Sequence, residues 1–222
     1  IGLLASLGLA EVDVYRKLRV AFFSTGDELR SVGEQLDNGA IYDSNRYTLY
    51  GMLSRLGVDI IDMGVVKDDQ KLMDKAFLDA TGNSDILITS GGVSVGEADY
   101  VKETLLKHGE VDFWKVAMKP GRPLTFGKLE STYFFGLPGN PVSVMVTFYQ
   151  FVQPALKKMA GERSPTPVMI KVPCVSSLKK RPGRVEYQRG ILEHDKNGRM
   201  VVRKTGAQGS GILRSMADAN CF

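Results

Sequence analysis

The sequence contains few of the residues from which disulfide frameworks and metal sites are built. Its 222 residues include only two cysteines and two histidines. Cys174 and Cys221 lack metal-ligand spacing and are too few for a disulfide framework, which suits a reducing compartment, so we expect a cytoplasmic protein. His108 and His194 are isolated, and we expect them on the surface or in turns rather than in catalysis.

Long apolar runs and one-sided charge are also missing. No uninterrupted hydrophobic stretch reaches the length of a membrane span, and residues 1–10 lack a basic leader and a cleavage pattern. The net charge is only +4, with acidic and basic residues interspersed. The one basic cluster, in residues 179–184, is typical of a solvated turn. We therefore expect neither a membrane nor a nucleic-acid partner.

The sequence does have enough apolar material for one large core, since 43% of its residues are hydrophobic. Strand patterns occur at residues 18–24, 58–66 and 85–89, and helical patterns at residues 44–56, 69–82 and 97–108. This alternation is typical of a parallel sheet with helices on both faces. We therefore predict an α/β fold with a doubly wound, mostly parallel sheet.

The second half of the chain changes character after one long predicted helix. Further strands are predicted at residues 111–116, 123–126 and 133–136, followed by the helix at residues 141–160. Residues 164–167 (SPTP) read as a linker to a small all-β unit with strands at residues 168–175, 186–193 and 200–204. The chain starts without Met in a helical pattern and stops in a strand pattern, so we expect a piece of a longer protein.

Acidic residues follow three of the predicted strands, at the edge where open parallel sheets bind ligands. They are Asp27 and Glu28 after the first strand, Asp68 and Asp69 after the second, and Glu97 and Asp99 after the third. Oxygen-only clusters of this kind suit Mg²⁺. A purely structural reading stays open, because loop aspartates commonly cap turns and Glu97 has capping-box spacing from Ser94.

Three loops have the composition of anion sites. Residues 90–96 (SGGVSVG) leave backbone N–H groups uncovered and lead into a helix, although they match neither a Walker A nor a dinucleotide fingerprint. Residues 119–123 and 137–143 are stiff, proline-rich loops. Prolines alone indicate turns. Together with Arg122 and the amides near Ser143, however, they predict a pocket for a tetrahedral oxyanion.

Several of these motifs together resemble one family, the molybdopterin molybdenumtransferases (the MoeA and gephyrin E-domain family). The motifs are residues 24–29 (STGDEL), 42–45 (YDSN), 90–100 (SGGVSVGEADY), 118–123 (MKPGRP) and 137–143 (LPGNPVS), with residues 182–184, 189–190 and 206–210 matching in the tail. The resemblance implies three parts. Residues 1–17 end a discontinuous N-terminal domain, residues 18–163 form the catalytic α/β domain, and residues 164–222 form an incomplete C-terminal β domain.

The resemblance also implies an activity in molybdenum cofactor biosynthesis. Proteins similar to this one cleave adenylylated molybdopterin with a divalent cation, expected here to be Mg²⁺, and insert molybdate into the dithiolene. They act as homodimers, with a molybdopterin adenylyltransferase as the upstream partner. Motif position implies Glu28, Asp68 and Asp99 as catalytic and metal-binding residues. The substrate-binding candidates are Ser90, Gly91, Gly92, Ser94, Lys119, Arg122, Pro138, Pro141 and Ser143.

Two alternatives compete with this function. A molybdopterin adenylyltransferase shares the glycine loop and the sheet, but it would consume ATP with free molybdopterin, whereas the transferase needs the adenylate already made. A gephyrin-like scaffold that dimerises and binds a receptor peptide belongs to another class, and nothing in the sequence identifies a peptide groove. The proline loops and the appended β unit favour the transferase.

Overall fold

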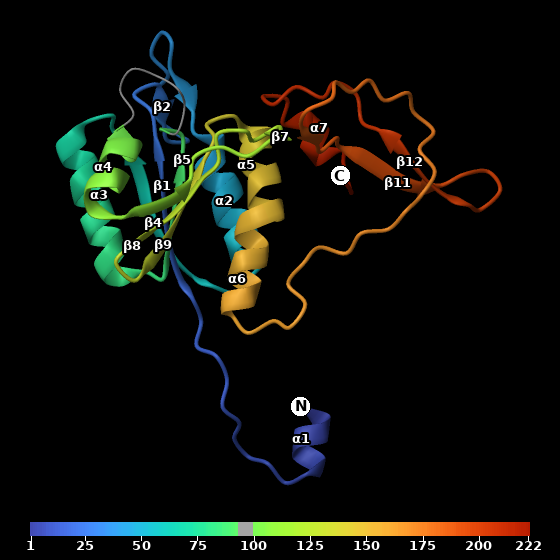
Figure 1. Cartoon of the computed structure of the whole chain (residues 1–222), viewed down its shortest axis with the longest axis horizontal. Coiled ribbons are helices and arrows are strands. Elements are labelled where there is room, and N and C mark those ends of the chain that lie inside the picture. Colours follow the sequence, from blue (N-terminus) through green and yellow to red (C-terminus); the bar gives the residue numbers. More distant parts are fainter. Residues whose placement is uncertain (93–99) are drawn as a thin grey trace.

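The computed structural model describes residues 1–92 and 100–222. A six-stranded sheet forms the centre of the molecule (Figure 1). Its strands are β1 (Arg19–Thr25), β4 (Asp59–Val66), β5 (Ile86–Ser90), β6 (Glu110–Phe113), β8 (Thr125–Leu129) and β9 (Thr132–Leu137), in the order β4-β1-β5-β9-β8-β6. The first four in this order are parallel, and β8 and β6 are antiparallel to their neighbours. The predicted mostly parallel sheet is confirmed.

Helices cover both faces of this sheet (Figure 1). One face packs against α2 (Ser44–Ser54), α5 (Pro141–Thr147) and α6 (Gln153–Met159), and the other against α3 (Gln70–Asn83) and α4 (Tyr100–His108). Along β1, Val20 and Phe22 point into the first layer, whereas Ala21 and Phe23 point into the second. A strand buried on both faces reads as a continuous apolar run, which is why β1 was predictable.

Aspartates start the two helices that follow β-strands of the first half. Asp43 Oδ1 accepts a hydrogen bond from the Arg46 N–H at 3.0 Å and caps α2. Asp69 Oδ1 accepts from the N–H groups of Lys71 and Leu72 at 2.9 and 3.0 Å and caps α3. Asp69 therefore has the structural role that the sequence left open. The predicted start of the third helix, at residue 97, lies outside the described residues.

The helix predicted at residues 141–160 is continuous but not regular. A π-helical segment, η1 (Phe148–Val152), separates α5 from α6. Pro154 sits in the first turn of α6 and has no N–H to donate to the preceding turn. Widening that preceding turn to the π geometry accommodates the proline without ending the helix.

The C-terminal part is smaller and less regular than predicted. Its elements are β10 (Val185–Glu186), β11 (Gly190–His194), β12 (Met200–Lys204) and α7 (Arg214–Ala217). The predicted strand at residues 168–175 is wrong, because only Cys174 forms a bridge, to Val202. Val168 and Met169 are each 92% exposed, and an apolar run without a partner strand gains no ladder hydrogen bonds.

The remaining short elements lie outside the six-stranded sheet. They are α1 (Gly2–Ser6), β2 (Leu29–Arg30), β3 (Ile41–Tyr42) and β7 (Met118–Lys119). The α1 helix and the chain up to residue 17 extend away from the sheet (Figure 1). Within the described residues, no helix is both long and apolar enough to cross a bilayer.

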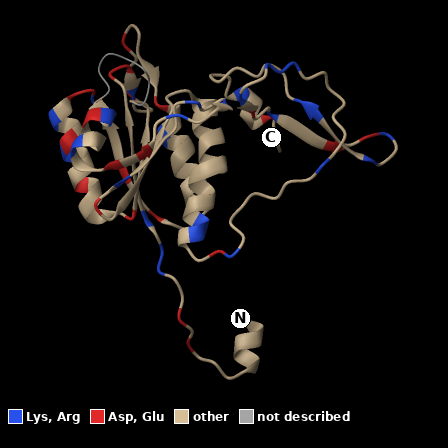
Figure 2. Cartoon of the chain, in the orientation of Figure 1, with Lys and Arg blue, Asp and Glu red and all other residues tan. Residues whose placement is uncertain are grey.

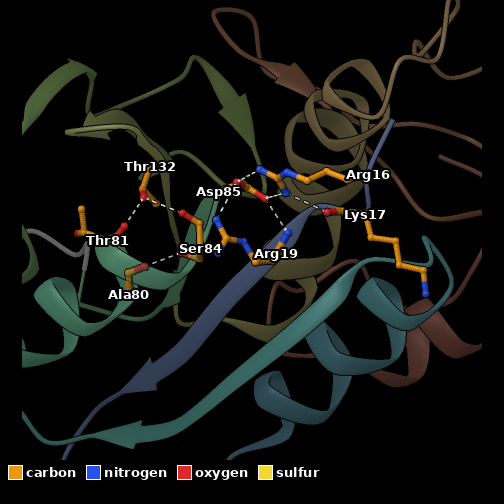
Figure 3. Close-up of polar contacts among 8 residues, drawn as sticks. All are labelled: Arg16, Lys17, Arg19, Ala80, Thr81, Ser84, Asp85 and Thr132. Atoms are coloured by element: carbon orange, nitrogen blue, oxygen red, sulfur yellow. Dashed lines mark hydrogen bonds and ion pairs between the residues drawn. The ribbon is translucent and has the colours of Figure 1, made fainter. Parts of the chain in front are cut away.

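The N-terminal arm is attached to the sheet through one carboxylate (Figure 3). Asp85, just before β5, accepts hydrogen bonds from Arg16 Nη1 at 2.7 Å, from Arg16 Nη2 at 2.6 Å and from the Arg19 N–H at 2.8 Å. The bonds from Arg16 lower the pKa of Asp85 to about 2, against the opposing effect of burial. This contact lies at the amino ends of the parallel strands, opposite the edge where ligands bind in such sheets.

Candidate active site

The loops after the four parallel strands begin side by side. In the sheet register, Thr25 pairs with Val66, and Ser90 pairs with both Ser24 and Leu137. The carboxyl ends of β1, β4, β5 and β9 therefore lie at one level. A cavity of about 660 Å³, called here the first cavity, lies over this edge.

The first cavity brings together most of the residues predicted from the strand ends. Of the candidates, it is lined by Glu28, Asp68, Ser90, Gly91, Gly92, Pro138 and Pro141. Ser94 and Asp99 lie outside the described residues. The described lining includes the carboxylates of Glu28, Asp43 and Asp68 but no lysine or arginine. The cavity is therefore acidic, and a phosphate group entering it would need a cation.

The two predicted carboxylates of the first cavity are held by different contacts. Asp68 accepts a short hydrogen bond from the Thr25 hydroxyl, and its own N–H donates to Asp27 Oδ1 at 3.3 Å. The Glu28 carboxylate folds over Gly26, where an added Cβ would lie 2.6 Å from Glu28 Oε2. Neither acid caps a helix, so both are available to a ligand.

These two acids fit part of a Mg²⁺ site. Mg²⁺ is usually bound by one or two carboxylates together with waters and substrate phosphates, and Glu28 and Asp68 supply that number of carboxylates on one cavity. Within residues 1–92 and 100–222, no group of three histidine, cysteine or acidic side chains is placed to hold a metal ion. A site here would therefore draw its other ligands from waters and substrate, or from residues such as Asp99 that are not described.

The turn after β5 has room only for glycine. Gly91 has φ +91°, and an added Cβ would lie 2.5 Å from the Thr25 carbonyl oxygen. Gly92 has φ +65°, and its Cβ would lie 2.5 Å from Val101 Cγ2. Positive φ and close backbone approach both exclude larger residues. The turn therefore presents glycine backbone without side chains to the cavity, and the Gly91 N–H itself donates to the Leu137 carbonyl at 3.1 Å.

Asn45 also lines the first cavity, and sequence reasoning gave it no role. Its Nδ2 donates to Ser90 Oγ at 2.9 Å and to the Gly139 carbonyl at 2.8 Å. The only sequence signal was its place in the motif at residues 42–45, directly after the cap of α2. Nothing in that motif shows that the side chain bridges two distant loops.

A second cavity of about 740 Å³ adjoins the first, because Pro123, Pro138 and Asn140 line both. The predicted oxyanion residues Lys119, Arg122 and Ser143 line this second cavity. Its described lining carries six cationic side chains and one acid: Lys119, Arg122, Lys179, Arg184, Arg189, Lys204 and Glu186. Lys119 Nζ lies 3.3 Å from Glu186 Oε1. Burial disfavours ionisation of Glu186, but Lys119 holds its pKa below the usual value.

Arg189 is the most unusual cation of the second cavity, because only 1% of it is exposed. Its Nε donates to Ser215 Oγ and its Nη2 to the Gly209 carbonyl, each at 3.1 Å. No carboxylate among the described residues forms an ion pair with it, and burial lowers the pKa of its guanidinium. A buried charge without a counter-charge is unfavourable, so this cation favours an anion in the cavity.

The sequence did not predict that cations of the C-terminal part would line the second cavity. Lys179 and Arg184 belong to the cluster predicted as a solvated turn; both are exposed, yet both line the cavity. Figure 2 shows basic residues along the loop that runs over β11 and β12. Only the docking of the two parts brings these cations beside Arg122, and no local sequence pattern encodes docking.

Comparison with known proteins identifies the family. Residues 21–158 match the family described as a probable molybdopterin binding domain, and residues 171–222 match the MoeA C-terminal region (domain IV). The chain belongs to the MoeA family. The MoeA resemblance of the sequence motifs is thereby confirmed.

Individual MoeA relatives match along the whole chain. The molybdopterin molybdenumtransferase of Haemophilus influenzae is 48% identical over 221 residues, covering 99% of this chain and 55% of that protein. The one from Nostoc is 40% identical over 228 residues, covering 100% and 52%. The solved MoeA protein of Pyrococcus horikoshii superposes with a TM-score of 0.79 at 31% identity, covering 99% and 52%. The chain spans about half the length of the relatives it matches.

Proposed function

We propose that this chain carries the reaction centre of a molybdopterin molybdenumtransferase in molybdenum cofactor biosynthesis. Its substrates would be adenylylated molybdopterin and molybdate, with Mg²⁺ as the cation. Family membership and the names of the relatives support this assignment. The observation that carries it is the pair of adjoining cavities of opposite charge, separated by Pro138.

The opposite charge of the two cavities affects how the substrates bind, because both substrates are anions. Two unit negative charges about 4 Å apart repel by about 1 kcal/mol in water and by more in a drier pocket. A cationic second cavity offsets this repulsion for molybdate. An acidic first cavity offsets it for the pyrophosphate only with a divalent cation, which makes the reaction metal-dependent.

In the first cavity, the protein's own groups would bind and orient the pyrophosphate. Glu28 and Asp68, with Asp99 by motif position, would hold Mg²⁺, which when bound stabilises charge that develops on the phosphate oxygens. The N–H of Gly92 and the hydroxyl of Ser90 would anchor the pterin-side phosphate, and Gly91, whose N–H donates to the Leu137 carbonyl, would contribute the shape of the turn. Glu28, which lines the same cavity, would also orient the water that attacks the pyrophosphate and releases AMP.

In the second cavity, the protein would hold molybdate beside the dithiolene. Arg122 and Ser143 would contact its oxygens, and Lys119 and the buried Arg189 would add positive charge. Pro138 and Asn140 belong to both cavities, so the two substrates would meet at this shared wall. The contribution of the protein is then mostly positioning.

Three substitutions in the full-length protein test this division of labour. Asp68→Ala should abolish metal-dependent turnover while leaving molybdate affinity near the wild-type value, and Asp99→Ala should do the same. Arg122→Ala should weaken molybdate binding by about 10- to 100-fold, the effect of losing a hydrogen bond to a charged group. Turnover assays and calorimetric titration with molybdate measure the two effects. If each substitution impaired turnover and molybdate binding equally, the assignment of the two substrates to separate cavities would be refuted.

The match of residues 171–222 to the MoeA C-terminal region favours the transferase over the adenylyltransferase. ATP consumption with free molybdopterin would reverse that preference.

We further propose that the protein acts as a homodimer in the cytoplasm, downstream of a molybdopterin adenylyltransferase. Size measurement by light scattering on the full-length protein tests the dimer. The limits of the α/β domain, after residue 17 and at residue 163, also stay predictions.

A further inference from the structure

Asn45 connects two loops of the first cavity through one amide group. Its Nδ2 donates to Ser90 Oγ at 2.9 Å, after β5, and to the Gly139 carbonyl at 2.8 Å, after β9. A carbonyl oxygen only accepts, so the NH₂ rather than the oxygen of the amide must face Gly139. Both amide hydrogens are thereby used, and the side chain is held in one orientation.

This geometry determines where the Ser90 proton points. Ser90 Oγ accepts from Asn45, so its own hydrogen must be donated elsewhere. Ser90 is 1% exposed, lines the first cavity and has no acceptor for this hydrogen among the described residues. We infer that Asn45 is a positioning residue that directs the Ser90 hydroxyl toward a phosphate oxygen of the substrate. The inference rests on the proposed function.

The second bond of Asn45 keeps the neighbouring loop in place. Gly139 lies between Pro138 and Asn140, which separate the two cavities, and an added Cβ on Gly139 would lie 3.8 Å from Gly91 Cα. The loop that separates the cavities also contacts the glycine turn, because the Gly91 N–H donates to the Leu137 carbonyl at 3.1 Å, and Asn45 holds both. Asn45 Oδ1, in contrast, is buried without a partner among the described residues. An unpaired buried oxygen is unfavourable for folding, which points to a role other than stability.

A double-mutant cycle in the full-length protein tests the inference. KM and kcat for adenylylated molybdopterin are measured for Asn45→Ala, Ser90→Ala and the double variant. Each single substitution should raise KM by about three- to tenfold, the range for one hydrogen bond, with kcat nearly unchanged. The effects of the two substitutions should not multiply in the double variant, because Asn45 acts on the phosphate through Ser90. Asn83→Ala removes a comparable amide-to-carbonyl bond at the exposed end of α3 and should change neither constant.

Several outcomes would overturn the inference. If the effects of Asn45→Ala and Ser90→Ala multiplied in the double variant, Asn45 would not act through Ser90. The same would follow if Asn45→Ala behaved like Asn83→Ala. Should Asn45→Ala fail to fold, Asn45→Asp keeps the size, removes the donor and enters the same cycle, and a wild-type KM for it would be equally contrary. Failure of the proposed function looks different: the wild-type protein itself would not turn over adenylylated molybdopterin.

Discussion

At the scale of single residues, Asp85 shows how one carboxylate attaches the N-terminal arm. It accepts two hydrogen bonds from Arg16 and one from the Arg19 backbone (Figure 3). These bonds stabilise the ionised form and lower the pKa of Asp85 to about 2 in the folded protein. An unfolded aspartate titrates near pH 3.9, so Asp85 adds stability above about pH 4 that is lost as pH falls toward 2.

Replacing Asp85 by asparagine should therefore lower the melting temperature at pH 7 by about 2–4 °C, a modest effect because Arg16 is mostly exposed. The difference from the wild-type protein should shrink as pH falls from about 4 to 2. Thermal unfolding followed by circular dichroism at several pH values measures it. Asp79→Asn, at an exposed position of α3, is the matched control and should shift the melting temperature little. A difference that stayed constant down to pH 2 would contradict the pKa assignment.

Single residues also show what the sequence can and cannot predict. That acidic residues follow β1 and β4 at this edge was predictable, because the rule that ligands bind at strand ends needs only the strands. The choice of Glu28 and Asp68 among these acids came from the family motifs and stays a prediction. Whether Asp68 or Asp69 caps α3 was not decidable from their spacing, since both follow β4. The burial of Arg189 and the bridge made by Asn45 depend on packing between distant segments, so no local pattern could reveal them.

At the scale of elements, the site depends on a turn rather than on a helix or strand. Gly91 and Gly92 have positive φ and lie against Thr25 and Val101, so the turn keeps its shape only without side chains. The strands that feed it were predictable because they are apolar on both faces. The π-helical segment and the absent strand at residues 168–175 were not, since one depends on Pro154 within its helix and the other on a partner strand.

Substituting alanine at Gly91 should be damaging, because the new Cβ meets the Thr25 carbonyl and φ is positive. We expect a loss of about 1–3 kcal/mol of unfolding free energy together with weaker binding of adenylylated molybdopterin. Gly82→Ala is the matched control. Gly82 lies in α3 with open space around its Cβ position, so alanine there should stabilise by about 0.5–1 kcal/mol. Urea unfolding compares the two, and equal effects would show that the turn tolerates a side chain.

At the scale of the whole molecule, the second cavity is formed by both the α/β part (residues 18–163) and the C-terminal part (residues 164–222). It exists only while these two parts are docked. Met216 of α7 packs with Met118, Val142 and Val146 of the first part. The Val142 N–H donates to the Ser210 carbonyl at 3.0 Å, and β10 pairs with β7. This docking brings the cations of the C-terminal part to Arg122.

Met216→Ala should therefore loosen the docking and weaken molybdate binding without changing the sheet. The expected loss is about 2 kcal/mol, at the low end for a methionine truncation because Met216 lies at the margin of the core. Limited proteolysis of the connector at residues 162–172 and molybdate titration measure the two consequences. Met169→Ala removes the same atoms from a side chain that is 92% exposed and should leave molybdate affinity unchanged. Unaltered molybdate affinity in Met216→Ala would argue against a cavity shared between the two parts.

We propose that molybdate binds in the cationic cavity beside the acidic one. Anomalous diffraction at the molybdenum absorption edge, from a crystal soaked in molybdate, tests it most directly. We expect a molybdenum peak between Arg122 and Ser143, next to Pro138. A peak in the acidic cavity among Glu28 and Asp68, or no ordered molybdenum in either cavity, would contradict it.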